Sequence, residues 1–198
     1  MITRLLPVPG TAALFIAALA ITTNVSAAQA ATPHFRSSQG QLVLRLHNAD
    51  GRVQSESVTP LAAASTVVCD AALENPHYSG GAESVIFKTR VTCSGNGLSI
   101  VQVRIRGTLG SICGAPPRGG PAQGPLVLRA TSDQIQNVTV NGGFTTYYTP
   151  MAGPGNPKVR GSGWYQGDVS GKIVGPPGIV SDDPPRAFSN RVWVNDPR

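Results

Sequence analysis

The sequence predicts an all-β fold, an antiparallel β-sandwich, with a small β-barrel as the alternative. The chain of 198 residues contains 23 Gly and 17 Pro, which interrupt it too often for long helices. Its apolar residues fall in short runs rich in Val, Ile, Thr and aromatic residues, as in strands separated by turns. The predicted strands are residues 41–46, 52–58, 65–69, 84–93, 98–106, 126–131, 135–140, 144–149, 163–169 and 191–194.

The N-terminal segment, residues 1–30, is predicted to be a secretory signal peptide that precedes the fold. Arg4 is followed by an apolar run over residues 11–21 and then by small residues up to Ala30. A membrane-spanning helix needs roughly 20 apolar residues, and this run is shorter. We therefore expect cleavage after Ala30 and a secreted, extracellular product.

The remainder, residues 31–198, has a length suited to a single β domain. The formal net charge of the whole chain is +6, a modest excess that solubility explains without a nucleic-acid partner. No later run is long and apolar enough to predict a membrane span after cleavage. The expected partner is an extracellular or cell-envelope component.

The clearest predicted element is a hairpin over residues 84–107. In its first strand, alternation puts one set of side chains on a common face, namely Val85, Phe87, Thr89, Val91 and Cys93. Residues 94–97 contain Asn and Gly, which tolerate the positive φ of a hairpin turn. In the second strand the parity of apolar residues changes between Ile100 and Val101. This change predicts a β-bulge at that point.

The same hairpin predicts a basic face. Its register places Lys88 directly opposite Arg104, with Arg90 and Arg106 close by. Like charges opposed across strands are unfavourable, so this face must be solvated or occupied by an anion. These four residues are candidate binding residues.

Long segments rich in Gly and Pro are predicted to be loops. They cover residues 110–125 and 150–163, and a third stretch, 175–185, begins a C-terminal region predicted to be irregular from about residue 175. Loops of this length within one domain are usually functional or disordered.

Three cysteines, Cys69, Cys93 and Cys113, follow the predicted cleavage site. In an oxidising compartment the odd number predicts one disulfide and one free thiol. The pairing stays open on geometry. A simple hairpin of the strand that ends at Cys69 with residues 85–93 would favour Cys113 as its partner, whereas a longer crossing would bring Cys69 to Cys93.

The segment 69–107 carries a resemblance. The run Asn-Pro-His-Tyr-Ser-Gly-Gly at residues 75–81, followed by the strand Val85 to Cys93, resembles small exported proteins of actinobacteria that have no assigned function. The resemblance implies an exported β domain, and its matched part is bracketed by Cys69 and Cys93. It favours a disulfide between these two and leaves Cys113 as a free thiol.

Catalytic and metal-binding motifs are not found. His34, His47 and His77 lack metal-ligand spacing, and no Cys-x-x-Cys pair occurs, so neither a metal site nor a cofactor is predicted. A small extracellular hydrolase is an alternative only if His47 or His77 meets a Ser and an Asp within hydrogen-bond reach.

The sequence favours a non-enzymatic binding protein. Trp164 and Tyr165 are binding candidates if their rings are exposed, and core residues otherwise. A second alternative function is a secreted protease inhibitor, in which the loop 110–125 presents Arg118 to an enzyme.

Overall fold

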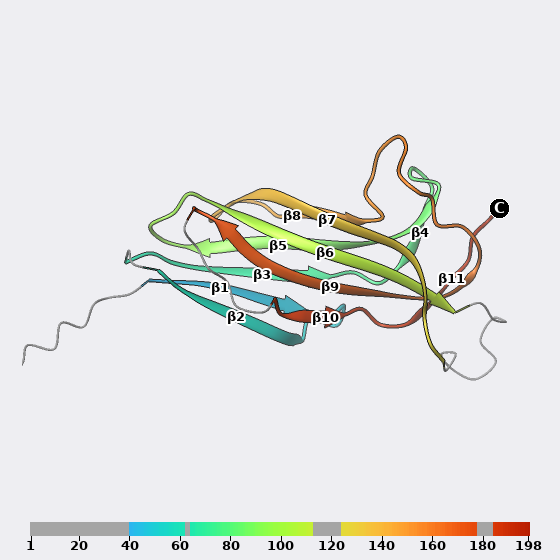
Figure 1. Ribbon diagram of the computed structural model, residues 1–198, viewed down its shortest axis with the longest axis horizontal. Coiled ribbons are helices and arrows are strands. Elements are labelled where there is room, and N and C mark those ends of the chain that lie inside the picture. The colour runs from blue at the N-terminus through green and yellow to red at the C-terminus, as the bar shows by residue number, and fades with distance from the viewer. Residues whose placement is uncertain (1–39, 62–63, 113–123, 178–183) are drawn as a thin grey trace, which may run out of the picture. The chain divides into compact units, whose positions relative to one another are not determined.

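The computed structural model describes residues 40–61, 64–112, 124–177 and 184–198. They form a β-sandwich of two sheets with no helix, which confirms the predicted fold class (Figure 1). The signal peptide predicted at residues 1–30 lies outside the described residues. So do Cys113 and Arg118, which fall in residues 113–123.

The first sheet contains six strands, and the second contains five. The strands of the first sheet are β1 (Gly40–His47), β2 (Val53–Leu61), β3 (Thr66–Leu73), β4 (His77–Ser79), β5 (Ser84–Gly95) and β8 (Thr145–Thr149). Those of the second are β6 (Ile100–Ile112), β7 (Val127–Thr139), β9 (Gly163–Gly175), β10 (Arg186–Phe188) and β11 (Val192–Val194). Pairing is antiparallel throughout except between β1 and β3, which run parallel.

The core lies between the sheets, because alternate residues of each long strand point inward. Close approach of the sheets depends on glycines of β9. A Cβ built on Gly167 would lie 2.8 Å from the ring of Phe87 in β5, and one on Gly171 would lie 3.1 Å from Leu44 in β1. The buried apolar side chains include Leu42, Leu44, Leu46, Val67, Ala71, Phe87, Val91, Val103, Ile105, Leu109, Val169 and Ile173.

Side chains connect the sheets at both pairs of edges. On one side, Gln134 and Gln136 of β7 donate to the main-chain carbonyls of Tyr148 and Thr146 in β8, at 2.7 and 3.1 Å. On the other, the side chain of Gln54 in β2 exchanges two hydrogen bonds with the main chain of β10. A single backbone bridge between Cys93 and Val140 also joins the layers within the described part of the chain. Because side chains and one bridge join these edges, and no continuous backbone ladder does, the described strands form a sandwich and not a closed barrel.

The predicted 84–107 hairpin is wrong in its pairing. β5 pairs with β3, β4 and β8, whereas β6 pairs with β7 and β9 in the other sheet. Their apolar faces therefore meet across the core. No bulge is needed at Ile100 and Val101, because Ile100 is simply outward, 50% exposed, and Val101 inward. The register irregularities of β6 lie instead at Gln102/Val103 toward β9 and at Leu109/Gly110 toward β7.

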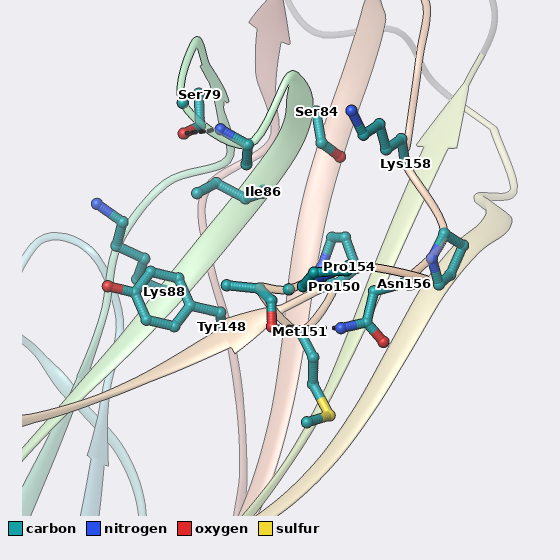
Figure 2. Close-up of a pocket in the computed structure, with 15 residues that line it drawn as sticks. Ser79, Ser84, Ile86, Lys88, Tyr148, Pro150, Met151, Pro154, Asn156 and Lys158 are labelled. Atoms are coloured by element: carbon teal, nitrogen blue, oxygen red, sulfur yellow. Dashed lines mark hydrogen bonds between the residues drawn. The ribbon is translucent and has the colours of Figure 1, made fainter.

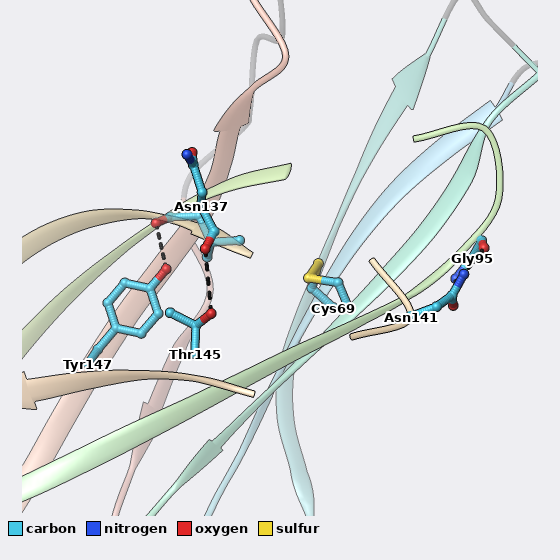
Figure 3. Close-up of a disulfide and its surroundings, with 8 residues drawn as sticks. Cys69, Gly95, Asn137, Asn141, Thr145 and Tyr147 are labelled. Atoms are coloured by element: carbon cyan, nitrogen blue, oxygen red, sulfur yellow. Dashed lines mark hydrogen bonds between the residues drawn. A yellow bond between two sulfur atoms is a disulfide. The ribbon is translucent and has the colours of Figure 1, made fainter. Parts of the chain in front are cut away.

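The disulfide between Cys69 and Cys93 is confirmed. β3 continues through Leu73, beyond the predicted strand end, and pairs with β5 so that the two cysteines lie directly opposite, with Cα atoms 4.0 Å apart. Both are buried in the core. Next to this bond, Asn141 exchanges two hydrogen bonds with the main chain of Gly95, at 2.9 and 3.1 Å (Figure 3). The disulfide and this amide hold the same end of β5.

Three differences concern the strands themselves. Residues 126–131 and 135–140, predicted as two strands, form the one strand β7. Strand β9 continues to Gly175, six residues beyond its predicted end. Strand β10 lies in the C-terminal region predicted to be irregular, where its three residues pair with residues 168–170 of β9.

Candidate functional site

A groove lies where the chain leaves the edge of the first sheet. β8 ends at Thr149, and residues 150–158 form a loop before the chain returns to β5. There the amide of Val85 donates to the carbonyl of Val159 at 2.9 Å, and the amide of Val159 donates to Ser84 Oγ at 2.8 Å. The loop covers the outer face of β5, so Ile86, an outward residue, is only 4% exposed.

The groove has a volume of about 580 Å³. Figure 2 shows Pro150 near the middle of the view, with Ile86, Lys88 and Tyr148 on one side and Asn156 and Lys158 on the other. Its remaining described lining residues are Ser79, Gly81, Ala82, Ser84, Met151, Ala152, Gly153, Pro154 and Pro157. Three prolines, Pro150, Pro154 and Pro157, restrict the backbone of the loop in this wall, because proline fixes φ.

The two lysines of the groove differ in their partners. Lys158 Nζ lies 2.8 Å from Glu83 Oε2. The ammonium of Lys88 lies 5.9 Å from the centre of the Tyr148 ring, within the range of a cation–π contact. Among the described residues, Lys88 pairs with no carboxylate. The Lys88 ammonium is therefore a positive charge in the groove that can bind an anionic group of a ligand.

Glu83 anchors the loop from outside the groove. Its carboxylate pairs with Arg198 at 2.7 Å, Lys158 at 2.8 Å and Arg160 at 3.3 Å. Hydrogen bonds donated by Arg198 and Lys158 lower the pKa of Glu83 to about 2. The carboxylate therefore stays ionised at neutral pH and ties the loop to the C-terminal residues.

The four basic residues assigned to one hairpin face lie on two sheets, so that face does not exist as predicted. Lys88 and Arg90 are outward residues of β5, whereas Arg104 and Arg106 are outward residues of β6. Arg90 pairs with Glu74 at 2.6 Å and lies over the ring of Phe144, with its guanidinium carbon 4.9 Å from the ring centre.

The two β6 arginines share the carboxylate of Asp133 on β7. Arg104 Nε donates to Asp133 Oδ1 at 2.7 Å, and Arg106 Nε donates to Asp133 Oδ2 at 3.1 Å. The hydrogen bond from Arg104 is the main cause that lowers the pKa of Asp133 to about 2. Asp133 therefore stays ionised beside both guanidinium groups.

Trp164 and Tyr165 are 6% and 2% exposed, so both rings are buried, as in the core alternative, and neither remains a binding candidate. Trp164 packs edge-on against Trp193, with ring centres 5.9 Å apart. The hydroxyl of Tyr165 donates to the carbonyl of Gly161 at 2.6 Å. Trp164 thus packs β9 against β11, and Tyr165 is hydrogen-bonded to the segment that precedes β9.

Neither His47 nor His77 forms a Ser-His-Asp arrangement with the described residues. His47 Nε2 lies 2.8 Å from Asp70 Oδ1, but its Nδ1 lies 3.2 Å from the carbonyl of Gly51 and so faces no serine. His77 Nδ1 lies 3.1 Å from the carbonyl of Asn75. Neither imidazole joins a Ser and an Asp.

Two further observations concern the described part of the chain. No group of three or more His, Cys, Asp or Glu side chains is placed there to hold a metal ion. It also contains no helix with the length and hydropathy of a membrane span.

The sequence had signals for part of the groove. Segment 150–163 was predicted to be a long loop, and Lys88 was a candidate binding residue. Tyr148, Met151, Asn156 and Lys158 were not predicted as site residues. Their convergence depends on the path by which the loop returns to Ser84, which no local pattern specifies.

Comparison with protein families finds none whose pattern matches this chain, and comparison with curated proteins finds no match either.

Proposed function

We propose that this protein is an exported, non-enzymatic binding module, and that its groove accepts an extended acidic segment of an extracellular or envelope partner. The observation that carries the proposal is the ammonium of Lys88, which lies at an open groove without a carboxylate partner among the described residues. A ligand carboxylate or other anion would supply that partner.

The rest of the groove favours binding over chemistry. Its lining includes the exposed apolar side chain of Met151, and Tyr148 offers an amphipathic ring beside the charge. The hydroxyl of Ser84 is engaged with the main chain of Val159. Among the described lining residues there is no His, Cys, Asp or Glu that could act as a base.

Export is supported by two independent features. The leader pattern of residues 1–30 is typical of a cleaved signal peptide. The buried disulfide between Cys69 and Cys93 is a bond that persists in oxidising compartments outside the cytosol. We expect the secreted product to begin at Ala31. Intact-mass measurement tests this, and retention of residues 1–24 in most molecules would contradict it.

The binding proposal is tested with matched baits. The mature protein, its Lys88→Glu variant and its Arg52→Glu variant are immobilised and exposed to culture medium and solubilised envelope. Arg52 is an exposed residue of the β1–β2 turn, so the control makes the same charge reversal away from the groove. We expect wild type and Arg52→Glu to retain the same component and Lys88→Glu to lose at least nine-tenths of it.

Two outcomes would overturn the proposal. One is equal capture by wild type and Lys88→Glu, which would place the contact elsewhere. The other is capture of nothing specific by wild type from either fraction. Circular dichroism of all three baits shows that any loss of capture is not loss of fold.

A further inference from the structure

A second cationic site lies on the outer face of the other sheet. In the ladder between β6 and β9, Arg104 is directly opposite Lys172, and Arg106 is opposite Ser170. Two like charges at facing positions repel each other, because their Cβ atoms stand only about 5 Å apart. The sequence predicts such an opposition between Lys88 and Arg104. The structure places it between Arg104 and Lys172.

The chain compensates this charge only in part. Asp133 is the single described carboxylate that pairs with Arg104 and Arg106, and it serves both. Lys172 has no carboxylate partner among the described residues. Three cations around one carboxylate leave two positive charges without compensation there.

These side chains line a small cleft. Its volume is about 80 Å³, and its described lining residues are Arg104, Arg106, Ser170, Gly171, Lys172 and Pro184. That space corresponds to roughly two to three water molecules in the liquid. It suits one compact ionic group.

We propose that this cleft is a binding subsite for a phosphate group. The oxygens of a phosphate lie in several directions, so one group could accept from the remaining guanidinium N–H donors of Arg104 and Arg106, from the Lys172 ammonium and from the Ser170 hydroxyl. Its charge of up to two matches the uncompensated charge of the cleft. A carboxylate is a weaker match than phosphate because it carries only one charge. In addition, the carboxylate of Asp133 already accepts hydrogen bonds from the Nε atoms of both arginines. The subsite is independent of the groove beside Lys88.

The test is a titration of the purified protein with inorganic phosphate, at constant ionic strength maintained with chloride. Amide chemical shifts are followed by ¹H–¹⁵N NMR. We expect saturable shifts confined to residues around Arg104, Ser170 and Lys172. Lys172→Gln should weaken phosphate binding at least tenfold, because it removes one charge-assisted donor and leaves the Asp133 pairs intact. Arg52→Gln is the matched control and should bind as wild type does.

The probes also separate the possible sources of the phosphate. Binding of glycerol phosphate without co-sedimentation on phosphatidylglycerol vesicles would assign the site to soluble esters. Co-sedimentation that Lys172→Gln abolishes would assign it to a lipid headgroup. Either result supports the subsite.

Three results would overturn the proposal. Acetate could produce the same shifts at the same concentrations as phosphate, or Lys172→Gln could bind phosphate as wild type does. The third is binding by Asp182→Asn/Asp183→Asn but not by wild type. Asp182 and Asp183 precede Pro184 in the sequence, and this result would show that the chain's own carboxylates fill the cleft.

Discussion

Removal of the Cys69–Cys93 disulfide should lower the free energy of unfolding by about 4.5 kcal/mol. The bond joins residues separated by 24 positions, and a crosslink of that span restricts the unfolded chain by about 3.5 kcal/mol in the chain-entropy relation. Both side chains are buried, at 0% and 3% exposure, so alanine also leaves small unfilled volumes that cost on the order of 1 kcal/mol.

The variant for this test is Cys69→Ala/Cys93→Ala, measured by urea unfolding with tryptophan fluorescence and circular dichroism. For a domain of this size the expected loss corresponds to a fall in Tm of roughly 10–15 °C. The control is Cys113→Ala, which should unfold close to wild type because Cys113 is predicted to be a free thiol. A loss below 1 kcal/mol in the double variant would refute the reasoning. An equal loss in Cys113→Ala would contradict the predicted free thiol.

Three further predictions concern packing, charge and the strand end. Gly167→Ala should lose about 1–3 kcal/mol in urea unfolding, because the added methyl group meets a buried aromatic ring at 2.8 Å, whereas Gly143→Ala, which meets nothing within 4 Å, should not. The pKa of Glu83 lies below its unfolded value of 4.5, so its ion pairs stabilise the fold above pH 4.5 and lose that effect as pH falls toward 2. Glu83→Gln should flatten the dependence of the free energy of unfolding on pH over this range. An unchanged dependence would show that ionised Glu83 does not stabilise the fold. Asn141→Gly should lose about 1–2 kcal/mol in thermal unfolding, since glycine keeps the positive φ of 60° but not the two hydrogen bonds; no loss would show that these bonds are not stabilising.

Strand faces were predictable from the sequence because alternation is a local property. Val85, Phe87, Val91 and Cys93 all point into the core, as their spacing indicates. Strand partners were not predictable in the same way. The alternation in residues 84–93 and 100–106 is compatible with two strands that pair as a hairpin in one sheet. It is equally compatible with two strands in different sheets whose apolar faces meet across the core. The choice depends on β8 and β9, which come much later in the chain and pair with β5 and β6.

The site residues illustrate the same limit. Lys88 was identifiable because an outward lysine in a strand is visible in the pattern. The burial of Ile86 was not, because it results from a loop that begins more than 60 residues later and covers the outer face. Trp164 and Tyr165 lie next to each other in β9, so alternation puts them on opposite faces. Tyr165 is buried in the core between the sheets, whereas Trp164 packs against Trp193 of β11, which comes much later in the chain.

The way the groove loop is fixed bears on how the groove would bind. One end continues from the paired strand β8, and the other is held by the hydrogen bonds between Ser84 and Val159. Glu83 adds ion pairs to Lys158 and Arg160, just before and after Val159. A wall fixed at both ends needs little further ordering when a partner enters, so less of the contact free energy is lost on binding. It follows that Lys88→Glu should weaken partner binding by direct loss of charge complementarity, without a change in how the wall of the groove is held.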